Sequence, residues 1–166
     1  MKKFIYSTVM MLAMMMSAAC VTSCGGSDDE PEKPIDASVG RHKIEISLSG
    51  DVSAFYVSYA FSGITTDGNA SPVYDASGKD QGLSYTNSGD DDQWTSVMAY
   101  TNNNAAYLTV GLVAHSDEVG KTLTITFKGY VNDKVVQTAT KTLTSKTEYD
   151  SWAFGFFSND GLKEVY

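Results

Sequence analysis

Two histidines are the side chains best suited to acid–base catalysis, and one stands among further reactive groups. His115 is followed directly by Ser116, Asp117 and Glu118, the residue types of a hydrolytic triad. A triad requires its members to converge in space, whereas neighbours in a short loop splay apart. His42 lies between two basic residues, where we expect a solvated side chain. The sequence also lacks a nucleophile elbow, a phosphate-binding loop and a zinc-protease motif. We therefore predict that the protein is not an enzyme.

Acidic side chains form two runs, one of Asp90, Asp91 and Asp92 and one of Asp117 with Glu118. Paired carboxylates could serve glycoside hydrolysis, but both runs fall in predicted turns, where such groups are usually solvated. Calcium suits the first run better, because this ion takes oxygen ligands in flexible geometry. The residues that could complete such a site are Asp67, Asn69 and Asp75. The spacing is not that of an EF-hand, so a weak structural calcium site and a solvated loop stay open as alternatives. We expect no other cofactor.

Aromatic side chains are abundant beyond residue 40, where nine tyrosines, two tryptophans and six phenylalanines occur. Glycan-binding faces place flat aromatic rings against sugars and hold the sugar hydroxyls with amides and carboxylates. The residues that combine these properties are Trp94, Tyr100, Asn102 and Tyr107. The alternative is that aromatic residues fill the core, which we expect of Trp152, Phe154 and Phe156.

The N-terminal segment has the pattern of an export signal. Lys2 and Lys3 precede the uncharged apolar run 4–16, which suits a signal peptide and is too short for a membrane span. Cys20 and Cys24 then compete as the cleavage junction. Cys24 is the better candidate, because a tether of small, acidic and proline residues begins directly after it.

The sequence Val21-Thr22-Ser23-Cys24 resembles a bacterial lipobox, although leucine is commoner at the position of Val21. The acidic residues just beyond it resemble the export signal of Bacteroidetes surface lipoproteins; these residues are Ser27, Asp28, Asp29 and Glu30. The resemblance implies a lipid such as palmitate on Cys24, and an outer-membrane location facing the cell exterior. It implies nothing about the folded domain. The alternative is an ordinary signal peptide cleaved near Ala19, which would leave Cys24 as a free thiol.

Three parts are predicted: a signal peptide over 1–23, a flexible acidic tether over 24–39 and one domain over 40–166. Without the signal peptide, ten basic and twenty acidic side chains remain, a formal net charge of −10. This charge argues against nucleic-acid binding and against electrostatic docking on an anionic bilayer. No cysteine follows Cys24, so the domain must be stabilised by its core and not by disulfides.

Apolar residues alternate with polar ones in segment after segment, which is typical of half-buried strands. The segments that we predict as strands are 41–49, 54–62, 94–100, 107–114, 122–131, 134–144 and 152–157. Asn132 and Asp133 form a predicted hairpin turn, while 65–92 and 115–120 are predicted to be irregular. The pattern predicts an all-β protein, an antiparallel β-sandwich of immunoglobulin-like or jelly-roll style.

Two functions agree with these observations. One is a non-catalytic surface module that binds a glycan or a host macromolecule, supported by the anchor and the aromatic residues. The other is a structural or accessory subunit of an outer-membrane assembly, which would use an apolar patch or an edge strand. The partners expected are therefore the membrane, through the lipid, and a glycan or an envelope protein.

Overall fold

Eleven strands and one short 3-10 helix, η2 (Val52–Ala54), make up the part of the chain described by a computed structural model, residues 39–87 and 93–164. The strands are β1 (His42–Gly50), β2 (Tyr56–Thr65), β3 (Ala70–Ser71), β4 (Val73–Asp75), β5 (Tyr85–Asn87), β6 (Ser96–Thr101), β7 (Ala105–Ser116), β8 (Thr122–Val131), β9 (Lys134–Thr144), β10 (Asp150–Phe157) and β11 (Gly161–Glu164). Within these residues no helix is long and apolar enough to cross a membrane.

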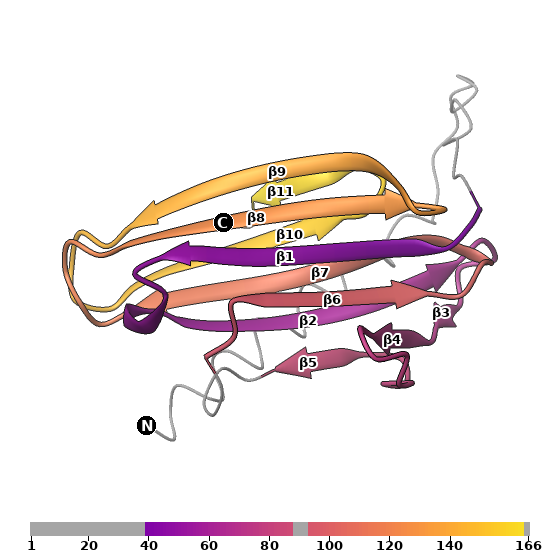
Figure 1. Cartoon of the computed structure of the whole chain (residues 1–166), viewed down its shortest axis with the longest axis horizontal. Coiled ribbons are helices and arrows are strands. Elements are labelled where there is room, and N and C mark those ends of the chain that lie inside the picture. The colour runs from indigo at the N-terminus through magenta and orange to yellow at the C-terminus, as the bar shows by residue number, and fades with distance from the viewer. Residues whose placement is uncertain (1–38, 88–92, 165–166) are drawn as a thin grey trace, which may run out of the picture. The chain divides into compact units, whose positions relative to one another are not determined.

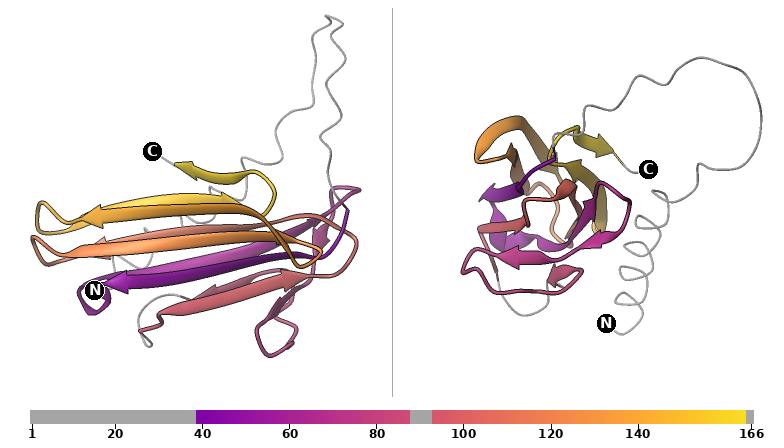
Figure 2. Two further views of the ribbon diagram at one scale, coloured as in Figure 1. Left: turned by 45° about the horizontal axis from the view of Figure 1, so that its top comes forward. Right: turned by 90° about the vertical axis from the view of Figure 1, so that its right-hand side faces the viewer.

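The strands form two antiparallel sheets that pack face to face as a β-sandwich (Figure 1). The five-stranded sheet has the order β4-β6-β1-β8-β9. The six-stranded sheet has the order β11-β10-β7-β2-β3, with β5 also paired to β2. Figure 2 shows the two layers from further directions. The predicted fold class, an all-β sandwich, is confirmed.

Side-chain alternation determines which face of each strand is buried. Ile44, Ile46 and Leu48 of β1 point into the sandwich, while the residues between them point outward. Phe127 of β8 and Phe156 of β10 are both fully buried and stack across the two sheets, with ring centroids 5.1 Å apart. Burying a side chain of this size stabilises the fold by about 2–3 kcal/mol.

The predicted hairpin between β8 and β9 is confirmed by its backbone. Asn132 and Asp133 have φ angles of 48° and 63°, the left-handed region required at both central positions of a type I′ turn. The segment 65–92, predicted to be irregular, contains three short strands. These are β3, β4 and β5, which pair with β2 and β6 at the sheet margins. β7 also runs on through His115 and Ser116, beyond its predicted end.

His42, predicted to be solvated, is fully buried, and that prediction is wrong. Strand alternation places it on the same side as Ile44, between the sheets, while its basic neighbours point outward. Its Nδ1 lies 2.8 Å from the hydroxyl of Ser158, which also accepts a hydrogen bond from the Leu108 amide at 3.0 Å. The buried histidine therefore joins β1 to the end of the opposite sheet.

Candidate functional site

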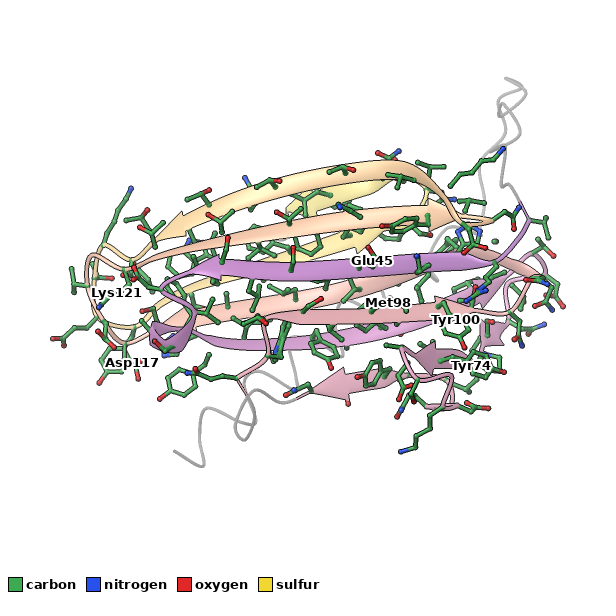
Figure 3. All side chains as sticks on the ribbon, in the orientation of Figure 1. Glu45, Tyr74, Met98, Tyr100, Asp117 and Lys121 are labelled. Carbon is green, nitrogen blue, oxygen red and sulfur yellow. The ribbon has the colours of Figure 1, made fainter. Side chains whose placement is uncertain are left out.

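Aromatic and cationic side chains from four strands, and from Arg41 just before β1, meet on the outer face of the five-stranded sheet. We call Arg41, Lys43, Tyr74, Tyr100 and Tyr130 the aromatic–cation row. Cross-strand register brings them together, because Tyr74 of β4 pairs with Tyr100 of β6, and Lys43 of β1 pairs with both Tyr100 and Tyr130. Figure 3 shows Tyr74 and Tyr100 side by side at one end of the sandwich.

The members of the row make two groups of ring contacts on this face. The rings of Tyr74 and Tyr100 stack with centroids 5.4 Å apart and an interplanar angle of 18°. The Arg41 guanidinium lies 4.3 Å from the centre of the Tyr100 ring, and the Lys43 ammonium lies 3.8 Å from that of Tyr130. Such cation–π contacts contribute about 0.5–1 kcal/mol at exposed positions. The row therefore consists of two ordered groups, one of Tyr74, Tyr100 and Arg41 and one of Lys43 and Tyr130.

Glu45 connects two members of the row. One of its oxygens lies 3.0 Å from the Lys43 ammonium, and the other accepts a hydrogen bond from the Tyr130 hydroxyl at 2.5 Å. Burial raises the pKa of Glu45, but the hydrogen bonds from Tyr130 and Lys43 outweigh this effect and hold that pKa below its usual value. The hydrogen bond to Glu45, together with burial, raises the pKa of Tyr130 to about 12.

Small hydroxyl side chains occupy another part of this face. We call Ser47, Ser96, Thr124, Thr126, Thr140 and Thr142 the hydroxyl patch. Register places Ser96, Ser47, Thr126 and Thr140 on one line across the sheet. The hydroxyl oxygens of Thr124 and Thr142 lie 3.3 Å apart, and those of Thr126 and Thr140 lie 3.4 Å apart. Because each hydroxyl can donate and accept, the patch offers paired hydrogen-bonding groups to a polar ligand.

The four residues predicted to bind a ligand do not gather at one place. Tyr100 belongs to the aromatic–cation row, and exposed Asn102 follows it in the turn after β6. Tyr107 lies on the outer face of the six-stranded sheet, with its ring 5.8 Å from that of Phe157. Trp94 packs against the core, and its indole N–H donates to the Val57 carbonyl at 3.1 Å. For Tyr100 and Asn102 a shared ligand surface stays a prediction.

A second aromatic cluster, which the sequence did not reveal, lies at the opposite end of the sandwich. The ring of His115 stacks between those of Tyr56 and Tyr149, with both centroid distances 6.2 Å. Tyr56 is 56% exposed and Tyr149 is 65% exposed. Tyr56 and His115 are direct register partners on β2 and β7, so only strand pairing brings them together.

The reactive residue types around His115 do not converge. The Nε2 atom of His115 pairs with the Asp117 carboxylate on the outer face. Ser116 points the other way, is fully buried, and donates to the Ala54 carbonyl at 2.9 Å. Successive strand residues face opposite sides of a sheet, so these two side chains cannot act as nucleophile and base on one substrate.

The carboxylates of Asp67 and Asp75 are occupied by hydrogen bonds within their own loops. Asp67 accepts hydrogen bonds from Thr65 and Asn69, and Asp75 accepts one from the Gln81 side chain at 2.6 Å. In residues 39–87 and 93–164 no group of three or more metal-ligating side chains comes together. The predicted calcium ligands Asp90, Asp91 and Asp92 lie outside the described residues. So do the predicted lipidation and export residues Cys24, Ser27, Asp28, Asp29 and Glu30.

Comparison with known proteins shows similarity to solved structures. A domain of unknown function, DUF4425, from Bacteroides vulgatus has a TM-score of 0.67 and 29% identity, over 74% of this chain and 98% of that one. A DUF4425 family protein from Bacteroides ovatus has a TM-score of 0.65 and 24% identity, over 72% and 96% of the two chains. The calcium-bound form of a protein from Parabacteroides distasonis has a TM-score of 0.56 and 19% identity, over 76% and 99%.

The neighbours from Bacteroides are consistent with a Bacteroidetes protein. No protein-family model matches the sequence, and no curated protein matches it.

Proposed function

We propose that this protein is a non-catalytic surface module that binds a glycan on the outer face of its five-stranded sheet. The observation that carries the proposal is the aromatic–cation row beside the hydroxyl patch, on one face of one sheet. Aromatic rings accept the apolar face or edge of a sugar, and hydroxyl side chains exchange hydrogen bonds with its hydroxyls.

The dimensions of the row suit an extended ligand. Neighbouring strands lie about 4.8 Å apart, so the four strands that carry the row span roughly 14 Å. That distance accommodates several linked sugar rings lying across the strands. The hydroxyl patch continues the same face along the strands and would contact a longer or branched chain.

The test is affinity electrophoresis of the mature protein, purified in detergent, through gels containing a panel of neutral and acidic polysaccharides. The double variant Tyr74→Ala/Tyr100→Ala is expected to bind at least tenfold more weakly than the wild type, which corresponds to 1.4 kcal/mol. Tyr56→Ala is the matched control, because it removes an exposed tyrosine from the other sheet. If no polysaccharide retards the wild type, or if both variants weaken binding equally, the proposed surface is wrong.

A second candidate function is that of an assembly subunit, and the edge of β9 favours it. Val135 and Val136 are 54% and 45% exposed on this long strand, which pairs in its sheet with β8 alone. Unpaired backbone groups of an edge strand can add a strand from another protein. A photocrosslinker at Val136 is then expected to form one discrete adduct on intact cells, whereas a crosslinker at exposed Thr147 forms none. Absence of an adduct at Val136 would count against this function.

We also propose that a lipid on Cys24 holds the protein at the outer membrane, as the lipobox-like segment suggests. Cys24→Ser is expected to move the protein from the membrane fraction to the soluble fraction. Neutralising Asp28, Asp29 and Glu30 together is expected to reduce protease access on intact cells, if these residues direct outward display. Unchanged partitioning of Cys24→Ser would reject this cysteine as the lipid site.

Calcium binding is proposed only for the acidic run Asp90, Asp91 and Asp92. Its support is the chemistry of three adjacent carboxylates, together with the calcium-bound neighbour of similar fold. Isothermal titration with calcium is expected to show a site in the wild type and none in the triple Asp→Asn variant. Equal heats for both proteins would remove calcium from consideration at this position.

A further inference from the structure

We propose that the glycan bound by this face is acidic, and that Arg41 is the residue that contacts its carboxylate or sulfate groups. This inference rests on the proposed function and specifies the class of ligand. It follows from three observations: the bonding state of Arg41, the distribution of charge over the molecule, and the position of Arg41 within the row.

Arg41 carries a charge that the described part of the protein does not neutralise. Its guanidinium lies over the Tyr100 ring, but no described carboxylate lies within ion-pair distance of it. Its Nε atom is buried and has no hydrogen-bond partner. Lys43, Lys121 and Lys163, in contrast, all pair with carboxylates. A buried donor without a partner is costly.

The charge on this face differs in sign from that of the whole chain. The chain has 12 basic and 20 acidic residues, a net charge of −8. Arg41, Lys43 and Lys128 lie on the outer face of the five-stranded sheet, with Glu45 between them and Asp80 at the margin beside Tyr74. Glu45 is engaged by Lys43 and Tyr130, and Asp80 accepts the Gly82 amide at 2.7 Å. By formal charge, the three cations named here exceed the two carboxylates by one, so this part of the molecule is slightly positive.

The chemistry of arginine favours an anionic ligand over a neutral one. Covering a guanidinium with a neutral sugar removes water from the charge and supplies only weak acceptors. A carboxylate or sulfate supplies two oxygens in the plane that a guanidinium fork can bind, and such charge-assisted bonds are about twice as strong as neutral ones. Tyr100 holds the guanidinium in place beforehand, which reduces the entropy lost on binding.

The excess charge is too sparse for a dense polyanion. Lys128 lies opposite Glu45, and the rest of the molecule is acidic, so a nucleic acid would be repelled outside the row. A glycan suits the surface better, because its charges are spaced by sugar rings that can contact Tyr74, Tyr100 and Tyr130.

The test compares polymers that share a backbone and differ in charge. The probes are polygalacturonate against its methyl ester, and chondroitin sulfate against desulfated, carboxyl-esterified chondroitin. Dissociation constants are measured for the detergent-purified mature protein by affinity electrophoresis at low and at physiological salt. The wild type is expected to bind at least one acidic polymer tenfold more tightly than its neutral counterpart. This preference should shrink at higher salt, because exposed charges are screened.

Variants then assign the preference to Arg41. Arg41→Ala is expected to lose at least tenfold in affinity for the acidic polymer while changing its affinity for the neutral counterpart less than twofold. Arg41→Lys keeps the charge without the planar fork, so its affinity for the acidic polymer is expected to lie between those of the wild type and Arg41→Ala. Lys163→Ala is the matched control, because it removes a cation paired with Asp160 on the other sheet. Circular dichroism checks folding, and if Arg41→Ala does not fold, Arg41→Gln replaces it.

The possible results separate this inference from the proposed function. Equal affinity for charged and neutral polymers, with the Tyr74→Ala/Tyr100→Ala effect intact, would overturn the acidic ligand and leave glycan binding standing. An acidic preference that Arg41→Ala and Lys163→Ala reduce equally would overturn the role of Arg41. Failure to bind any polymer, charged or neutral, would overturn both. Tight binding of duplex DNA in place of every glycan would also overturn the inference.

Discussion

Gly129 of β8 lies directly against the backbone of Ser158, just past the end of β10, and its substitution by alanine tests that contact. A Cβ atom built on Gly129 of β8 would lie 2.4 Å from the backbone oxygen of Ser158 and 2.9 Å from its Cα. Ordinary contacts of carbon atoms lie at about 3.5–4.0 Å. The two backbones would therefore have to separate by about 1 Å.

Neither backbone can move without losing bonds. β8 is hydrogen-bonded to β1 on one side and to β9 on the other. The Ser158 amide donates to the Leu108 carbonyl at 2.9 Å, and its hydroxyl contacts His42. Overpacking of this kind costs about 1–3 kcal/mol, and two fixed backbones favour the upper end. A loss of about 3 kcal/mol lowers the Tm of a domain of this size by roughly 10 °C.

Urea denaturation and differential scanning calorimetry of Gly129→Ala measure this loss. Gly155→Ala is the matched control, since Gly155 also lies in a strand but the nearest atom to its Cβ is the Lys163 oxygen at 3.9 Å. There alanine is expected to gain about 0.5–1 kcal/mol, because it restricts the unfolded chain more than glycine does. If Gly129→Ala is as stable as Gly155→Ala, the close contact between Gly129 and the Ser158 backbone is refuted.

Three further perturbations test the surface and the sheet junction. Tyr130→Phe removes the hydroxyl that donates a hydrogen bond to the Glu45 carboxylate, so the pKa of Glu45, measured by NMR titration, should rise. The pKa of Glu45 is lower in the folded protein than in the unfolded chain, so its ionised form stabilises the fold at a pH above the unfolded pKa, and this stability is lost as the pH falls through the folded pKa. An unchanged Glu45 pKa in the variant would contradict the hydrogen bond from Tyr130. His42→Leu and Ser158→Ala should each cost about 1–3 kcal/mol in urea denaturation, and together less than their sum, because they share one buried hydrogen bond; additive losses would refute this. Asp150→Ala should speed hydrogen exchange of the two loop amides that donate to its carboxylate, and unchanged exchange would show that these bonds do not hold the loop.

The longer strands could be predicted from the sequence, because the alternation of apolar and polar residues is visible within each segment of the chain. The alternation of Leu123, Ile125 and Phe127 with threonines is enough to identify β8 and its buried face. The short strands β3, β4 and β5 lack such a pattern, since two or three residues cannot show a period. They are strands only because β2 and β6 offer unpaired edges beside them.

The surface residues were harder to predict because composition does not say which way a side chain points. Trp94 and Tyr100 both stand near amides and carboxylates in the sequence, yet Trp94 packs against the core and Tyr100 faces outward. The prediction of a solvated His42 is wrong for the same reason. Its charged neighbours suggested water, but a strand turns every second residue inward whatever the adjacent residue is.

The order of residues along the chain is enough to predict an all-β domain without disulfides, with alternating strands and an acidic charge, behind a lipobox-like segment. The three-dimensional arrangement was needed to show that Arg41, Tyr74, Tyr100 and Tyr130 share one face, and that no described carboxylate pairs with Arg41. This difference arises because alternation is a local property with a period of two. Register, in contrast, is set by hydrogen bonds between strands far apart in the sequence, and by the burial of both sheets against each other.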